Sequence, residues 1–254
     1  TVEGVRRFAE LDAISEITAG SFTLRARTGN KEPTFTEVGP GTYLNASGLP
    51  NGGLVYLEEN IAAMIETAGA KRLRISIAPI EPGDLSVMTA FLKDYPVTLE
   101  VNTSCPNVWH AGVQKPLTCH DPDAFERTLA EVTDARDDLR LAMKLSPLPD
   151  TLREKIIRLC HAYGIDEIVT MNTRPNMSTI KDGKQLLLVP VAGLSGHAIA
   201  EEALEEIRKT RNILDSTTGA SMRLIGCGGI DSPAMVRRME EAGADAVQVG
   251  SYAF

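Results

Sequence analysis

Residues 96–107 read PVTLEVNTSCPN. The opening of this stretch alternates apolar and polar residues and is rich in β-branched side chains, which predicts a strand over 97–102. Polar residues, a cysteine and a proline follow directly, from Asn102 to Asn107. Polar side chains at the end of a buried strand are typical of the carboxyl edge of a parallel sheet, where α/β proteins carry their binding sites.

The same order of elements recurs along the chain. Amphipathic helical patterns separate short β-branched runs, and two of them begin with clear capping signals, Asp121–Pro122 and Ser232–Pro233. A further helix is expected around 5–18. Repeated strand–helix units imply an α/β fold of parallel strands joined by right-handed crossovers. Strands are predicted at 21–27, 72–78, 97–102, 139–144, 166–171, 222–226 and 245–249.

The distribution of polar clusters separates a closed barrel from an open sheet. An open doubly wound sheet gathers function at one switch point, whereas a barrel collects all strand ends around one mouth. Here polar clusters follow many strands, which favours a (β/α)8 TIM barrel forming a single domain over residues 1–254. Because only seven strands are found, the first strand is expected upstream of Thr1, and the closing helix is expected beyond Phe254.

Composition excludes several classes of protein. The chain has 254 residues and a formal net charge of -8, so its field opposes nucleic acids and anionic lipid surfaces. No apolar run approaches the roughly 20 residues of a membrane span. The four cysteines lack C-x-x-C spacing, which argues against a disulfide framework or a metal site and favours the cytoplasm: Cys105, Cys119, Cys160 and Cys227.

Two glycine-rich segments near the end indicate an anion site. They read LIGCGGID at 224–231 and VQVGSYAF at 247–254. Small residues at a strand-to-helix turn let backbone N–H groups approach a phosphate, although the same glycines could simply form tight turns that close the barrel. Because neither a G-x-G-x-x-G nor a Walker motif occurs, a group with one phosphate is expected rather than a dinucleotide or triphosphate.

One lysine and four asparagines also end predicted strands or turns. Lys144 ends LRLAMK, with an apolar run expected below it inside the barrel, and a buried ammonium there needs an anionic or polar partner unless it snorkels to solvent. Asparagine amides both donate and accept, which suits a planar ligand edged with carbonyl and N–H groups, although each alone is more often a turn residue. These asparagines are Asn45, Asn102, Asn107 and Asn172.

Cys105 is the candidate for acid–base chemistry. A thiol has an ordinary pKa of about 8.5, much closer to working pH than that of a serine hydroxyl, so it can act as a general base. It could instead be a nucleophile, but neither His110 nor His120 stands at a spacing that identifies a Cys–His pair. The other three cysteines are expected to be packing residues.

Seven motifs together resemble the dihydroorotate dehydrogenases, which are FMN-dependent (β/α)8 barrels. They are ASGLPN at 46–51, EVNTSCPN at 100–107, KLSP at 144–147, Asn172–Thr173, GLSG at 193–196, IGCGGI at 225–230 and VQVGS at 247–251. Because Cys105 stands where the membrane-bound class has serine, the resemblance implies the soluble class, a homodimer. The segment VQKPL at 113–117 favours the single-subunit branch that uses fumarate over the branch that passes electrons to an iron–sulfur and FAD subunit.

The resemblance also implies a role for each matched residue. Cys105 would take a proton from C5 of dihydroorotate while a hydride leaves C6 for the flavin, giving orotate. The residues implied to bind the pyrimidine are Asn45, Gly48, Leu49, Asn102, Asn107, Asn172 and Thr173. Those implied to bind FMN are Lys144, Thr170, Gly196, Cys227, Gly228, Gly229, Gly250 and Ser251.

The chain departs from the family pattern at three places. Leu24 aligns with a lysine near the end of the second strand, Val2–Gly4 replace an Ala-Ser-Gly loop after the first strand and bring Glu3 beside the flavin, and Ser47 replaces a methionine. The alternatives are therefore a related flavin barrel acting on another dihydropyrimidine, or a catalytically degraded ligand-binding barrel. A phosphate-binding isomerase would need paired acidic residues at strand ends, which the sequence does not offer.

Overall fold

A curled parallel sheet forms the centre of the molecule. The computed structural model describes residues 1–110, 113–217 and 221–251, and within them seven strands make this sheet. The two edge strands approach each other, since Gln248 Nε2 on the last strand donates to Thr18 Oγ1 on the first at 3.0 Å. The strands, in their order across the sheet, are β1 (Glu16–Phe22), β4 (Arg72–Ile77), β5 (Val97–Asn102), β8 (Arg140–Leu145), β9 (Glu167–Thr170), β14 (Arg223–Cys227) and β15 (Ala246–Gln248).

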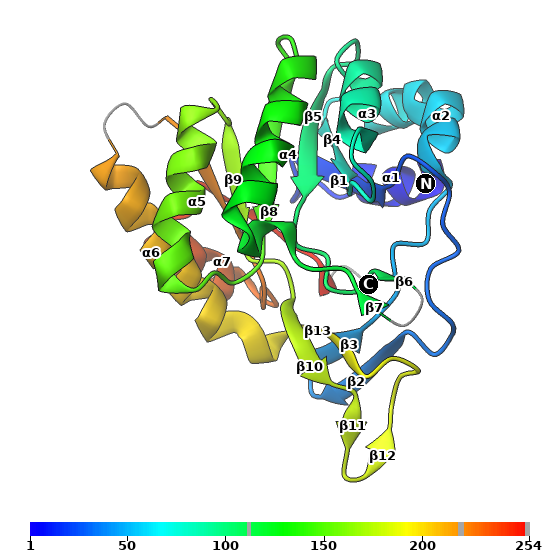
Figure 1. Cartoon of the computed structure of the whole chain (residues 1–254), viewed down its shortest axis with the longest axis vertical. Coiled ribbons are helices and arrows are strands. Elements are labelled where there is room, and N and C mark those ends of the chain that lie inside the picture. The colour runs from blue at the N-terminus through cyan, green and yellow to red at the C-terminus, as the bar shows by residue number, and fades with distance from the viewer. Residues whose placement is uncertain (111–112, 218–220, 252–254) are drawn as a thin grey trace.

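Helices cover the outer face of this sheet, as Figure 1 shows for α2 to α6. The predicted capping signals are confirmed: the Asp121 carboxylate accepts from the amides of Asp123 and Ala124, and the Ser232 hydroxyl accepts from Met235. No helix among the described residues combines the length and apolar character needed to cross a membrane. The helices are α1 (Val2–Ala9), α2 (Gly53–Ala68), α3 (Asp84–Leu92), α4 (Pro122–Ala135), α5 (Asp150–Ala162), α6 (Ala200–Ser216) and α7 (Pro233–Glu241), with short 3₁₀ turns at Thr118–His120 and His197–Ile199.

The two faces of the sheet have different cores. Outward-facing residues such as Leu99 and Val101 join the large apolar core beneath the helices. Inside the curl, a small apolar cluster of Ala142, Val169 and Ile225 is accompanied by buried charged residues. The expectation of an apolar run below Lys144 inside the barrel is therefore wrong, because the residues of β8 that share the inner face are Arg140 and Ala142.

A second, antiparallel sheet lies beyond the carboxyl ends of the parallel strands, at the bottom of Figure 1. Its strands come from two distant parts of the chain, and the register places Asn45 opposite Gly193. The sheet therefore brings an early loop of the chain onto the mouth of the curled sheet. Its strands are β10 (Arg174–Ser178), β13 (Val191–Gly196), β3 (Thr42–Asn45) and β2 (Phe35–Gly39), and two short ladders pair β11 (Ile180–Lys181) with β12 (Lys184–Gln185) and β6 (Trp109–His110) with β7 (Val113–Gln114).

The N-terminal region differs from the sequence prediction. The strand expected at 21–27 is wrong, since β1 runs from Glu16 to Phe22, and the helix expected around 5–18 ends at Ala9. The residues 16–22 alternate in burial and pair in parallel with β4, so tertiary pairing selects a strand there. The other six predicted strands lie within two residues of their observed bounds.

Candidate active site

A cavity opens at the carboxyl ends of the parallel strands. Residues that end β8, β9, β13, β14 and β15 line it, together with Tyr43 of the second sheet. The structure thus brings to one place residues that are more than 100 positions apart in the sequence. The sequence-predicted residues in its lining are Lys144, Asn172, Thr173, Gly196, Cys227, Gly228, Gly229, Gly250 and Ser251.

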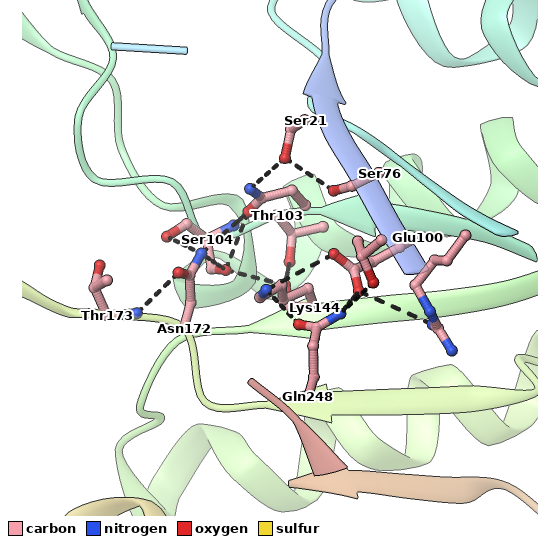
Figure 2. A network of polar contacts seen from close by, with 12 residues as sticks. Ser21, Ser76, Glu100, Thr103, Ser104, Lys144, Asn172, Thr173 and Gln248 are labelled. Atoms are coloured by element: carbon pink, nitrogen blue, oxygen red, sulfur yellow. Dashed lines mark hydrogen bonds and ion pairs between the residues drawn. The ribbon is translucent and has the colours of Figure 1, made fainter. Parts of the chain in front are cut away.

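The four predicted asparagines form two hydrogen-bonded pairs at this cavity, and the loop after β5 contributes one asparagine to each pair. Asn107 Nδ2 donates to Asn45 Oδ1 at 2.8 Å. Asn172 Nδ2 donates to Ser104 Oγ at 2.9 Å and to Asn102 Oδ1 at 3.3 Å. Figure 2 shows Asn172 and Ser104 pointing toward each other within a network that continues to Lys144. The loop after β5 is therefore fixed from two sides, by β3 and by the segment after β9.

Two polar atoms of this region have no hydrogen-bond partner. Thr173 Oγ1 and Asn107 Oδ1 are both buried, and no described residue donates to or accepts from them. A Cβ at Gly193 would lie 2.4 Å from Thr173 Oγ1, so the glycine lets the threonine approach β13 closely. Buried polar atoms in native proteins are normally satisfied by protein, water or ligand, so these two point to a polar ligand at this position.

The loop at 46–51 is held against the cysteine loop by a residue that the sequence reasoning missed. Asn30 Nδ2 donates to the carbonyl oxygens of Ala46 at 2.6 Å and of Asn107 at 3.0 Å. Gly48 has φ +74°, and a Cβ there would lie 2.7 Å from Asn30. Leu49 has φ 60°, which is costly for a bulky residue and persists only where its surroundings impose it.

Cys105 lies partly exposed in the loop between β5 and β6. Burial raises the pKa of its thiol, and a hydrogen bond from the backbone of Asn107 and the charges of Arg27, Lys115 and Lys144 act against this without reversing it. The thiol is therefore mostly protonated at neutral pH, and its basic form becomes more abundant as the pH rises.

Lys144 forms the cationic floor of the cavity. Its Nζ donates to Gln248 Oε1 at 2.6 Å and lies 3.8 Å from Glu100 Oε1. Burial is the largest influence and acts to lower the pKa of Lys144, but the acidic groups around it, led by the Glu100 carboxylate, together raise the pKa. The ammonium is therefore charged throughout the physiological range, and the expectation that it has an anionic or polar partner is confirmed.

The glycine-rich segments form the opposite rim. Gly229 has φ +67°, and a Cβ there would lie 2.5 Å from Ala200 Cα, so this turn requires glycine. The turn leads into the N-terminus of α7, whose backbone N–H groups favour an anion. Asp231 adds a carboxylate at the same rim, and His197 Nδ1 lies 2.8 Å from it.

These residues fit a flavin mononucleotide. Small residues and a helix N-terminus suit a phosphate, and the Lys144 ammonium suits the electron-rich edge of the ring. The Asp231 carboxylate at the same rim is engaged by the ring of His197, whose Nδ1 lies 2.8 Å from Oδ2.

Some predicted residues lie outside the cavity lining. Thr170 is 2% exposed on β9 and does not line the cavity, whereas its neighbour Met171 does. Leu24 follows the end of β1 by two residues and packs against the core. Glu3 lies in α1 and pairs with Arg6 on the exposed surface, so it is not in a loop after a strand.

Three polar residues that contact the site residues were not predicted from the sequence. Glu100 and Gln248 contact Lys144 from β5 and β15, and Ser21 Oγ accepts from Asn102 Nδ2 at 2.9 Å. The available signal was alternation, because Glu100 precedes Asn102 by two residues and so shares its face of β5. On β15, Gln248 precedes Gly250 by two residues, so the same alternation places it inside the curl.

Comparisons with known proteins identify the family of this chain. A family model described as dihydroorotate dehydrogenase matches residues 2–254. The catalytic subunit of dihydroorotate dehydrogenase B (NAD(+)) from Porphyromonas gingivalis is 30% identical over 250 residues, which cover 97% of this chain and 77% of that protein. Dihydroorotate dehydrogenase A (fumarate) from Limosilactobacillus reuteri is 29% identical over 248 residues, covering 96% of this chain and 77% of that protein.

A solved structure supports the fold. The crystal structure of DHODH from Eimeria tenella in complex with ferulenol superposes with a TM-score of 0.75 at 17% identity, covering 92% of this chain and 69% of that one. The fold class is thereby confirmed as that of a (β/α)8 barrel, of which the described residues supply seven strands. With the family model matching nearly every residue, the chain belongs to the dihydroorotate dehydrogenase family of oxidoreductases.

Proposed function

We propose that the protein converts dihydroorotate to orotate with bound FMN, as a step of pyrimidine biosynthesis. The observation that carries the proposal is the convergence of Asn45, Asn102, Asn107 and Asn172 around the Cys105 loop, next to a cavity floored by Lys144. Amide groups gathered in this way both donate and accept hydrogen bonds, which suits the carbonyl and N–H edges of a pyrimidine ring. The unpaired Thr173 Oγ1 and Asn107 Oδ1 supply further polar contacts.

Each side chain has a distinct task in the proposed reaction. The asparagines and Thr173 bind and orient the pyrimidine, and Cys105 removes the proton from C5. FMN, when bound, supplies the acceptor for the hydride that leaves C6. Lys144 would hold the flavin ring, and the turns at Gly228–Gly229 and Gly250–Ser251 would hold its phosphate. Cys227 and Gly196, which also line the cavity, complete the proposed flavin contacts.

The raised pKa of Cys105 determines how the rate of flavin reduction should depend on pH. Only the thiolate can accept the proton, and burial raises the pKa of this thiol. The rate of flavin reduction is therefore expected to increase with pH up to the pKa of the thiol and to level off above it.

Anaerobic reduction of the flavin tests the proposal. Purified protein is expected to carry FMN near one equivalent, and its absorbance is expected to bleach on addition of dihydroorotate. Cys105→Ala should keep its FMN but lose reduction by about 10²–10⁴-fold, the usual contribution of a positioned general base. Cys160→Ala is the matched control, because Cys160 is a fully buried thiol on α5 and should leave reduction unchanged.

Three results would contradict parts of the proposal. Protein that is colourless and does not bind added FMN would favour a catalytically degraded barrel. Protein that binds FMN but is reduced only by a different dihydropyrimidine would assign another substrate. A Cys105→Ala variant that is reduced at the wild-type rate would remove Cys105 as the base.

Fumarate is the proposed electron acceptor. The segment VQKPL at 113–117, directly after the cysteine loop, supports this assignment. The reduced protein should be reoxidised by fumarate under anaerobic conditions and not by NAD(+). Reoxidation by NAD(+) after addition of an electron-transfer subunit, with no effect of fumarate, would reverse the assignment.

A further inference from the structure

We propose that Glu100 and Gln248 are positioning residues that keep Lys144 charged and directed toward the cavity. Gln248 lines the cavity and Glu100 lies behind it, and both contact Lys144, the one lysine in the cavity lining. Figure 2 shows Glu100 and Gln248 meeting at the Lys144 ammonium. The inference rests on the proposed binding of FMN for its functional meaning.

The amide of Gln248 can work in only one orientation. Its Oε1 accepts from Lys144 Nζ at 2.6 Å, while its Nε2 donates to Glu100 Oε2 at 2.9 Å and to Thr18 Oγ1 at 3.0 Å. Turning the amide over would place Nε2 against an ammonium and Oε1 against a carboxylate. Gln248 therefore links the lysine to its counter-ion, which lies 3.8 Å away, beyond direct hydrogen-bond distance.

Glu100 makes the largest contribution that opposes the cost of burying this ammonium. Glu100 is 1% exposed, and no other carboxylate lies in salt-bridge range of Lys144 Nζ among the described residues. The remaining ionisable groups that face Lys144 are Arg74 on β4, Cys227 on β14 and Cys105 in the loop after β5. Arg74 repels the ammonium. The two thiols are mostly protonated, and so uncharged, at neutral pH, because burial raises the pKa of both.

Once the Glu100 charge is removed, burial and the repulsion from Arg74 remain, and both lower the pKa of Lys144. In Glu100→Gln the pKa of Lys144 is expected to fall toward neutral pH, whereas Glu100→Asp keeps the charge and should keep the lysine protonated. Gln248→Leu removes the linking amide and should lower the pKa of Lys144 as well, by less than Glu100→Gln.

Two measurements test this. The first needs no flavin: protein labelled with ¹³C-lysine is titrated by NMR, and the Lys144 signal is identified by its loss in Lys144→Met. The second measures FMN dissociation constants of the apoprotein by fluorescence quenching from pH 7 to 9.5. Wild type and Glu100→Asp should bind FMN with little dependence on pH. Glu100→Gln should lose about tenfold or more in affinity across this range, the usual worth of a charge-assisted contact.

The outcomes separate this inference from the proposed function. A Lys144 pKa that is the same in Glu100→Gln as in wild type would overturn the positioning role, whether or not FMN binds. If Glu100→Gln does not fold, an unchanged Lys144 pKa in Gln248→Leu has the same consequence. Wild-type protein that shows the expected lysine titration but does not bind FMN would leave the positioning role intact and refute flavin binding. A uniform loss of FMN affinity at all pH values would indicate a purely structural role for Glu100.

Discussion

Replacing Glu167 by Gln is expected to destabilise the fold by about 3 kcal/mol. Glu167 begins β9, is 1% exposed, and faces Arg74 on β4, Arg140 on β8 and Arg223 on β14. The arginines lie 3.1 Å (Arg140) and 2.9 Å (Arg223) from Glu167 Oε1, and Arg74 bonds to Oε2. The substitution keeps the size of the side chain and removes the charge that three strands share.

The size of this stability loss depends on whether each arginine finds another partner, or solvent, once the Glu167 charge is gone. Removing one partner of a buried ion pair costs about 3–5 kcal/mol when the other charge is left uncompensated. The side chains of Arg140 and Arg223 are 46% and 31% exposed, so they can turn toward solvent. Arg74 is only 3% exposed but keeps its contacts with Glu16 and Glu100. The cost therefore belongs at the lower end of the range.

Thermal unfolding followed by circular dichroism measures this cost. About 3 kcal/mol corresponds to a Tm lower by roughly 6–12 °C for a chain of this size. Glu154→Gln is the matched control, because its carboxylate pairs with Arg158 at 2.8 Å on the exposed face of α5, and such a pair contributes at most about 1 kcal/mol. If Glu167→Gln lowers the Tm no more than Glu154→Gln does, the buried network does not stabilise the curled sheet.

The same variant has a defined pH dependence. Burial acts to raise the pKa of Glu167, but Arg74, supported by Arg140 and Arg223, outweighs burial and lowers the pKa. A carboxyl group with a lowered pKa contributes stability above its ordinary pKa, about 4.3, and loses that contribution as the pH falls through the folded-state value. The stability difference between wild type and Glu167→Gln should therefore be full at pH 7 and shrink below about pH 4.3.

Three further substitutions test other parts of the argument. Thr173→Val removes a buried hydroxyl without a partner, so it should leave the Tm unchanged or slightly higher while weakening orotate binding about 2–10-fold, measured by calorimetry. Gly229→Ala should lower the Tm far more than Gly69→Ala. Both glycines have positive φ, but only at Gly229 would the new Cβ meet backbone, 2.5 Å from Ala200 Cα. Equal effects on the Tm would show that φ alone matters. Asp121→Ala removes the N-cap of α4 and should cost about 1 kcal/mol in urea unfolding, with no change at Asp121→Asn.

Local sequence signals located most elements of the fold. Six of the seven parallel strands were placed within two residues because short β-branched runs alternate with capped amphipathic segments, as at Asp121 and Ser232. The strand Glu16–Phe22 was missed because it contains Ala19 and Gly20, which have low strand propensity. Its identity as a strand depends on pairing with β4, more than fifty residues further along the chain.

The second sheet could not be predicted from local pattern. Its inner pair joins Asn45 to Gly193, 148 residues apart, and a one-residue change of register would turn Asn45 away from Asn107. The amide groups themselves were predictable from the sequence. The pairing of these amide groups could not be predicted, because it depends on how the second sheet packs over the carboxyl ends of the parallel strands.

Sequence pattern alone identifies the residues proposed to carry the chemistry, because the cysteine, the lysine, the glycine turns and most of the asparagines stand at the ends of predicted strands. Which face of each strand lies inside the curl depends on tertiary packing. Period-two alternation shows that the two faces of β8 differ, but parallel strands are buried on both faces, so it does not show which face is inner. The curl of the sheet brings Lys144, Glu100 and Gln248 from three strands into one network.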